Sequence, residues 1–267
     1  MCGFCDIENK EEKISLFTEE EIDTFIFGVY AGIYSVKNLD LSTYLKIARK
    51  LSQGVFTGYS KTLFETLYPS DDWVMLSALQ ENVYMFSAAK QYTMLREMNK
   101  QLVTDKTITP FREFRKAAGE IFETFNENHL RAEYNSAIGQ ARSASRWQEY
   151  VKEANVLPNL KYQTAGDGRV RPEHQILDNI VRPVGDKIWD KYSPQNGWNC
   201  RCIVIQEDGD TKITKVPKNI SETDVPLEFR FNAGKEKIIF SKEHPYFKDV
   251  SRKDKANARN NWGLPIP

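Results

Sequence analysis

Four side chains in the second half of the chain have the types and spacing of metal ligands. Cys200 and Cys202 form a CxC pair, and an extended strand would point both thiols to the same face. Thiolate and imidazole groups are preferred zinc ligands. We therefore predict a structural metal site, with zinc as the candidate ion, formed by Cys200, Cys202, His174 and His244.

Other interpretations of the cysteines stay open. Cys200 and Cys202 could simply be small buried residues that anchor a loop. A catalytic thiol is disfavoured because no base stands beside either cysteine in the sequence. Cys2 and Cys5 form a separate CxxC pair, which could supply metal ligands or remain as two thiols in a polar N-terminal segment.

A second cluster of charged residues precedes His174. Arg169 and Arg171 alternate, so an extended backbone would project both to one side, where they could contact phosphate or DNA. Salt links from these arginines to Asp167 and Asp178 would instead fix the loops. A hydrolytic centre is a third interpretation, because a helix over 173–180 would place His174 and Asp178 on one face.

Two tryptophans in the same stretch are interpreted as structural. Trp189 and Trp198 flank the loop sequence SPQNG, and such large side chains usually cover a loop as part of the core.

The elements that must position these residues change in character near residue 156. Before that point, apolar residues recur at three- and four-residue steps and predict helices over about 18–33, 41–54, 70–102, 110–122 and 129–151. After it, short strand-like runs are predicted over 160–164, 203–206, 211–216 and 237–239. The residues EDGD between the second and third of these runs indicate a hairpin.

The expected fold class is therefore α+β, with a mainly helical N-terminal region followed by a small, loop-rich module with short antiparallel strands. The predicted divisions are a flexible N-terminus, a helical region, the α+β module and a basic polar tail, over 1–16, 17–155, 156–248 and 249–267.

Composition excludes several classes of protein. The 267 residues contain 37 Lys plus Arg and 37 Asp plus Glu, so bulk charge indicates no particular partner. No apolar run reaches the roughly 18 residues that a membrane span needs. The first residues lack the apolar core of a secretory signal, so we expect a protein made and kept in a cytoplasm.

The order of motifs across about 133–247 resembles the phage head morphogenesis family named after protein F of phage Mu. The segments that carry the resemblance are DGRVRPEH, LDN, IWDKYSPQNGWNCRC, FNAG and HPYF. The positions that match the family's motif are Asp167, Arg169, Arg171, His174, Asp178, Trp198, Cys200 and Cys202.

The resemblance implies a minor head protein of a tailed phage or prophage, located in the virion and in the host cytoplasm during assembly. It implies portal, capsid or scaffold proteins as partners, double-stranded DNA as a further contact, and no membrane. It also implies a Cys/His metal site and no enzymatic activity. The alternatives are a metal-dependent hydrolase or nuclease, for which the sequence offers no water-activating Glu motif, and a DNA-binding module.

Overall fold

The computed structural model describes residues 16–256 except 105, 219 and 221–224. The expectations for Cys2 and Cys5, for most of the N-terminal segment, and for residues 257–267 of the tail lie outside the described residues.

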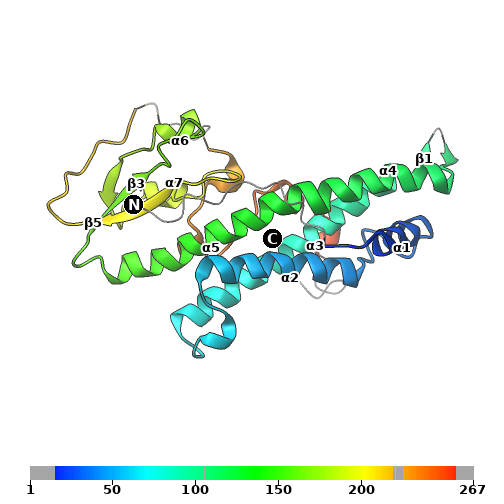
Figure 1. The fold of residues 1–267 in the computed structure, drawn as a ribbon, viewed down its shortest axis with the longest axis horizontal. Helices are drawn as coiled ribbons and strands as arrows, with labels where there is room; N and C mark the ends of the chain where they lie inside the picture. The colour runs from blue at the N-terminus through cyan, green and yellow to red at the C-terminus, as the bar shows by residue number, and fades with distance from the viewer. Residues whose placement is uncertain (1–15, 105, 219, 221–224, 257–267) are drawn as a thin grey trace.

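Five helices build the first half of the described chain, as the sequence predicted. They are α1 (Glu19–Tyr30), α2 (Leu41–Tyr59), α3 (Asp71–Lys100), α4 (Phe111–Glu123) and α5 (Leu130–Lys152). Polar side chains fix three of the starts: Thr18 forms a capping box with Glu21, and the side chains of Asp40 and Ser70 accept from backbone N–H groups of α2 and α3. A π-helical turn, Thr124–His129, joins α4 to α5, so that the two helices form one long rod (Figure 1).

The core of this half lies between α2, α3 and α5. The backbones of α2 and α5 pack closely at Gly58, where an added Cβ would lie 2.1 Å from the carbonyl oxygen of Ile138. One buried ion pair crosses it: the ammonium of Lys90, fully buried, donates to Glu133 at 2.5 Å and to the carbonyl of Phe125 at 2.6 Å. Such a pair is tolerated because the buried ammonium has both a carboxylate and a carbonyl as acceptors.

A three-stranded antiparallel sheet forms the second half, and the α+β class is confirmed. β3 (Asn159–Gln163) lies in the centre, between β4 (Val181–Pro183) and β5 (Ile203–Glu207). The register pairs Leu160 with Arg182 on one side and with Gln206 on the other. Two short helices, α6 (Pro172–Gln175) and α7 (Ile188–Tyr192), lie in the connections between the strands (Figure 1).

Two predicted strands were wrong. The segment 211–216 forms no strand and no hairpin with β5; it runs beside β4, where Thr214 N donates to Val181 O at 3.1 Å. The partner of β5 is instead β3, some forty positions earlier in the chain. The run 237–239 is also not a strand, because Lys237 adopts φ +56° and ends α8 (Ala233–Glu236).

Other short elements were missed or mispredicted. The hairpin of β1 (Val103–Thr104) with β2 (Thr107–Ile108) and the strand β4 were not predicted. The predicted helix over 173–180 is reduced to the four residues of α6.

The last described part of the chain packs against the helices of the first half. After the turn η3 (Leu227–Phe229), α8 packs against α5, and α9 (Pro245–Asp249) packs against α3. Asn82 of α3 fixes the connection between them, because its side chain accepts from Ile239 N and Phe240 N and donates to Phe240 O. The segment 231–250 therefore completes the core of the helical half rather than that of the sheet.

Candidate metal centre

The loop before β5 carries both cysteines, and a buried asparagine holds its shape. The side-chain oxygen of Asn196 accepts from the hydroxyl of Tyr162 at 2.9 Å, and its amide donates to Ser193 O at 3.1 Å. Arg171 reaches across from the start of α6 and donates to Trp198 O at 2.7 Å. These bonds tie the cysteine loop to β3 and to the short helix that carries His174.

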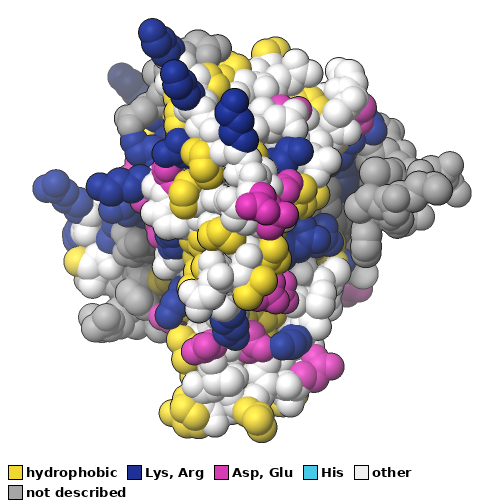
Figure 2. All heavy atoms as spheres, turned by 90° about the vertical axis from the view of Figure 1, so that its left-hand side faces the viewer, with side chains coloured by type: hydrophobic (Ala, Val, Ile, Leu, Met, Phe, Trp, Pro, Cys, Tyr) yellow, Lys and Arg dark blue, Asp and Glu magenta, His cyan; other side chains and the backbone are white. Residues whose placement is uncertain are grey.

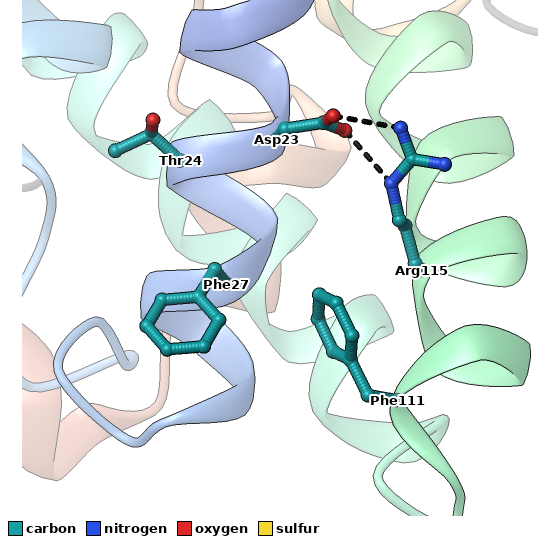
Figure 3. Close-up of a pocket in the computed structure, with 5 residues that line it drawn as sticks. All are labelled: Asp23, Thr24, Phe27, Phe111 and Arg115. Atoms are coloured by element: carbon teal, nitrogen blue, oxygen red, sulfur yellow. Dashed lines mark hydrogen bonds and ion pairs between the residues drawn. The ribbon is translucent and has the colours of Figure 1, made fainter.

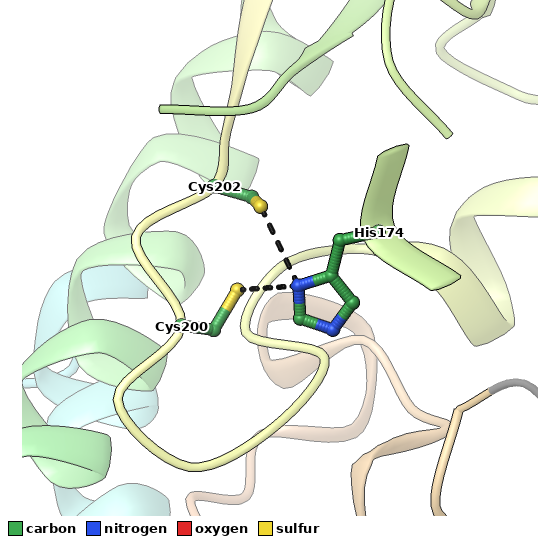
Figure 4. Close-up of side chains that lie close together, drawn as sticks. All are labelled: His174, Cys200 and Cys202. Carbon is green, nitrogen blue, oxygen red and sulfur yellow. Dashed lines mark hydrogen bonds between the residues drawn. The ribbon is translucent and has the colours of Figure 1, made fainter. Parts of the chain in front are cut away.

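His174, Cys200 and Cys202 meet in the interior (Figure 4). Nδ1 of His174 lies 3.7 Å from Sγ of Cys200 and 3.6 Å from Sγ of Cys202, and all three residues are buried. A tetrahedral zinc ion with ordinary Zn–S and Zn–N bonds would hold a sulfur and a nitrogen about 3.6 Å apart. Both nitrogen–sulfur distances therefore match those at a tetrahedral ion, and all three donor atoms lie within 4.8 Å of one another.

The second ring nitrogen of His174 determines which tautomer faces the sulfurs. Nε2 lies 3.2 Å from the carbonyl oxygen of Asn196, which can only accept, so Nε2 carries the proton. The lone pair of Nδ1 then points at both sulfurs. The single lone pair of Nδ1 can accept a hydrogen bond from only one thiol at a time. A metal ion bound between the three atoms would instead be coordinated by Nδ1 and by both sulfurs. A histidine whose other nitrogen donates to a carbonyl is the usual arrangement at protein metal sites.

The electrostatics of the group favour deprotonation of one thiol. The hydrogen bond from Cys202 and the nearby imidazole of His174 hold the pKa of Cys200 well below its usual value, although burial opposes this. The hydrogen bond with Cys200, together with burial, raises the pKa of Cys202. Burial lowers the pKa of His174, but the hydrogen bond and charge of Cys200 outweigh it and leave that pKa raised. A bound cation would favour loss of the remaining thiol proton.

His244, the fourth ligand expected from the sequence, lies elsewhere. It is the N-cap of α9, where its Nδ1 accepts from Tyr246 N at 3.1 Å. Its ring packs against Phe86 and Trp198, with centroid distances of 4.9 and 5.7 Å. Within the described residues, the group that could hold a metal ion therefore has three members, His174, Cys200 and Cys202.

The two arginines of the motif make different contacts. Arg169 is exposed and lies 3.6 Å from Asp167, whereas Arg171 holds the cysteine loop. The main partner of Asp167 is Arg201, which the sequence analysis did not select. Both ends of its guanidinium contact the Asp167 carboxylate at 2.7 Å, and this bond lowers the pKa of Asp167. Arg201 is the central residue of the CxC, so strand alternation could have placed it opposite the thiols.

Asp178 stabilises the backbone at the end of β3 by hydrogen bonds. Its carboxylate accepts from the backbone N–H and the hydroxyl of Thr164, at 2.8 and 3.0 Å, and from the side chain of Asn179. The chain turns at Asn179, with φ +60°, so that the His174–Asp178 face of a longer helix does not form.

The tryptophans are packed as expected for anchors. Trp189 is 1% exposed, and its indole N–H donates to Pro183 O at 2.9 Å. Trp198 is half-buried and stands edge-on to Phe229 and His244, so it connects the cysteine loop with the returning C-terminal segment.

Comparison with known proteins assigns the segment that contains this centre. Residues 80–205, from within α3 to β5, match the family described as Phage Mu protein F like protein. This part of the chain is therefore similar to the Phage Mu protein F-like family, and the resemblance that the motif order indicated is confirmed. The match begins earlier than the motif order suggested, and it ends before the FNAG and HPYF motifs.

Two relatives carry names. A protein of Escherichia phage Mu named "Putative capsid assembly protein F" is 41% identical over 71 residues, which cover 27% of this chain and 16% of the relative. A "Mu-like prophage FluMu F protein" of Haemophilus influenzae is 31% identical over 64 residues, 24% of this chain and 16% of the relative. The matched segments thus span about a sixth of these relatives. No solved structure matches the chain.

Proposed function

We propose that this protein is a minor head protein of a tailed phage or prophage, which acts in head morphogenesis by binding other head proteins. The observation that supports this most strongly is the family match over residues 80–205, together with the capsid-assembly name of the phage Mu relative. The partners would be portal, capsid or scaffold proteins, and the protein would reside in the virion and in the host cytoplasm during assembly. None of the helices in the described part of the chain has the length and apolar character that a bilayer crossing requires.

The metal ion would stabilise the fold of the loop and would have no catalytic role. His174, Cys200 and Cys202 are all buried, and the group contains no carboxylate to activate a water molecule. Two thiols and an imidazole suit zinc far better than magnesium or calcium, which prefer oxygen ligands. We therefore propose structural zinc and no enzymatic activity.

A contact with packaged DNA would fall to Arg169. Its side chain is 71% exposed, whereas Arg171 is held by the carbonyl of Trp198. Figure 2 shows lysine and arginine side chains spread over this end of the molecule and interspersed with acidic ones, which supports an auxiliary contact rather than a dedicated DNA-binding face.

Assembly with head proteins is the experiment that tests the proposal. The chain is co-expressed with the portal and capsid proteins of the same phage or prophage genome, and particles are isolated by sedimentation. We expect the protein in the particle fraction and fewer infectious particles when its gene is deleted. Failure to bind portal or capsid, with particles of normal yield and infectivity in the deletion, would contradict the proposal.

A further inference from the structure

A buried tyrosine of β3 lies against the loop that carries the cysteines. Tyr162 is 1% exposed and packs in the same apolar cluster as Cys200 and Cys202. The register of β3 with β5 pairs it with Val204, two positions after the second cysteine. The sequence analysis did not select Tyr162 as a site residue, yet the fold places it beside the candidate metal centre.

The hydroxyl of Tyr162 donates a hydrogen bond to the side chain of Asn196. Its Oη lies 2.9 Å from Asn196 Oδ1, and the amide nitrogen of the same side chain donates to Ser193 O at 3.1 Å. Because a backbone carbonyl can only accept, the bond to Ser193 fixes which end of the amide faces the tyrosine. Tyr162 therefore keeps its proton as a donor, and we do not count it as a fourth metal ligand.

Asn196 connects this hydrogen bond to His174. The asparagine is 0% exposed, and its side chain is held by Tyr162 on one side and by Ser193 on the other. Its backbone carbonyl oxygen lies 3.2 Å from Nε2 of His174. Because the residue cannot turn without breaking its side-chain bonds, the carbonyl stays directed at Nε2.

The orientation of the imidazole depends on this carbonyl. Within the described part of the chain, the ring nitrogens of His174 have hydrogen-bonding contacts with Asn196 O and with the sulfurs of Cys200 and Cys202 alone. The bond at Nε2 keeps the lone pair of Nδ1 directed toward the two sulfurs (Figure 4). Without a fixed acceptor at Nε2, the ring could rotate or carry its proton on Nδ1, and its lone pair would then no longer face an ion.

We propose that Tyr162 is a positioning residue of the metal centre, which acts through Asn196 to direct the Nδ1 lone pair of His174 at the ion. The inference rests on the structural zinc proposed above and deepens it, because it names a residue outside the ligand set that determines zinc affinity. Loss of a hydrogen-bond partner behind a metal-binding histidine typically costs 10–100-fold in affinity. Since Tyr162 acts at one remove from the histidine, we expect a loss of about tenfold.

The variant Tyr162→Phe tests the proposal, because it removes one hydroxyl and keeps the ring that packs in the core. Zinc affinity of the full chain is measured by competition with a chromogenic chelator, well below the melting temperature. We expect zinc to bind about tenfold more weakly than in the wild type. The cobalt-substituted protein gives a second measurement, because the absorption bands of cobalt(II) depend on ligand geometry, and we expect these bands to shift. A purely structural role would lower the melting temperature and leave both properties unchanged.

Tyr150→Phe is the matched control. The hydroxyl of Tyr150 donates to Val204 O at 2.5 Å, so this change removes the same kind of hydrogen bond from the same sheet. That bond leads to β5 and not to Asn196. We expect a lower melting temperature, with zinc affinity and the cobalt spectrum as in the wild type.

A remote control lies in the pocket between α1 and α4, at the opposite end of the molecule from the sheet (Figures 1 and 3). There the guanidinium of Arg115 donates to both carboxylate oxygens of Asp23, at 2.9 and 2.7 Å. Asp23→Ala removes both bonds and should leave zinc affinity unchanged. A weaker zinc affinity in this variant would show that general loss of stability, and not positioning of His174, accounts for the effect of Tyr162→Phe.

A double variant tests whether Tyr162 acts through Asn196. If it does, the two losses of affinity do not add, and Tyr162→Phe/Asn196→Ala should bind zinc as weakly as Asn196→Ala alone. If Asn196→Ala does not fold, Tyr162→Phe decides the matter by itself. Wild-type zinc affinity in Tyr162→Phe, or losses that add in the double variant, would overturn the inference and leave the structural zinc in place. A wild type that binds neither zinc nor cobalt would overturn both.

Discussion

His174 and His244 carry the same side chain but direct the lone pair of Nδ1 at different partners. In His174 this nitrogen faces two sulfurs, while Nε2 donates to Asn196 O. In His244 it accepts from Tyr246 N, and the ring is enclosed by aromatic side chains. The sequence His-Pro at 244–245 could have indicated this role, because proline is common at the first position of a helix and the preceding residue then serves as the cap.

The stability of the protein should therefore depend on the protonation of His244. Burial, and then the charges of Lys90 and His129, lower the pKa of His244 to about 3. Below the usual histidine pKa near 6.5, the unfolded chain binds a proton that the folded chain does not. Stability that is fully present above pH 6.5 is then lost as the pH falls toward 3, by up to about 1.4 kcal/mol per pH unit.

The variant His244→Asn isolates this effect, because asparagine keeps an acceptor for the helix cap and does not titrate. Urea unfolding at pH 7 and pH 5 should show that the wild type loses about 2 kcal/mol more than the variant over this interval. Equal losses in the two proteins would show that His244 does not govern the acid sensitivity.

At the scale of elements, α2 packs so closely on α5 at Gly58 that only a residue without a side chain fits there. Its Cβ would lie 2.1 Å from the backbone oxygen of Ile138, which cannot rotate away. Gly58→Ala should therefore lower the free energy of unfolding by 1–3 kcal/mol or more, to about the extent of other overpacked cores. Urea unfolding monitored by circular dichroism measures the change.

Gly119→Ala in α4 is the matched control. Apart from the local backbone of α4 itself, no atom lies within 4 Å of the added methyl, so helix propensity alone should stabilise the protein, by roughly 0.5–1 kcal/mol. Loss of stability in both variants, or in neither, would contradict the assigned helix packing.

The elements also show which structure could be predicted from sequence. The long helices followed from apolar periodicity and from caps such as Thr18 and Ser70, which are local signals. The strands β3 and β5 were also predicted, but β4 and the pairing of the sheet were not, because β3 pairs with strands about twenty and forty positions later and its register depends on those distant contacts. The candidate metal centre could be predicted in part. The CxC pair restricted the candidates, but only the folded loop selects His174 over His244.

At the scale of the whole molecule, the candidate metal centre lies where the sheet meets the helices. Trp198 follows directly from the buried loop residues Asn196 and Gly197 and contacts both Phe229 and His244. At the same junction Gly234 leaves space for Trp147 of α5, since an added Cβ would lie 2.3 Å from that side chain. An ion held by His174, Cys200 and Cys202 would therefore stabilise the junction as well as the loop.

Metal content is the measurement that tests this account most directly. Elemental mass spectrometry of protein purified without chelator should find about one zinc ion per chain. The metal should be lost in Cys200→Ser/Cys202→Ser and in His174→Ala, with a clear fall in melting temperature, because the energy of metal binding contributes to folding. His244→Asn should keep its zinc. A metal-free wild type, or zinc retained in the double cysteine variant, would contradict the account and leave Cys200 and Cys202 as ordinary buried residues.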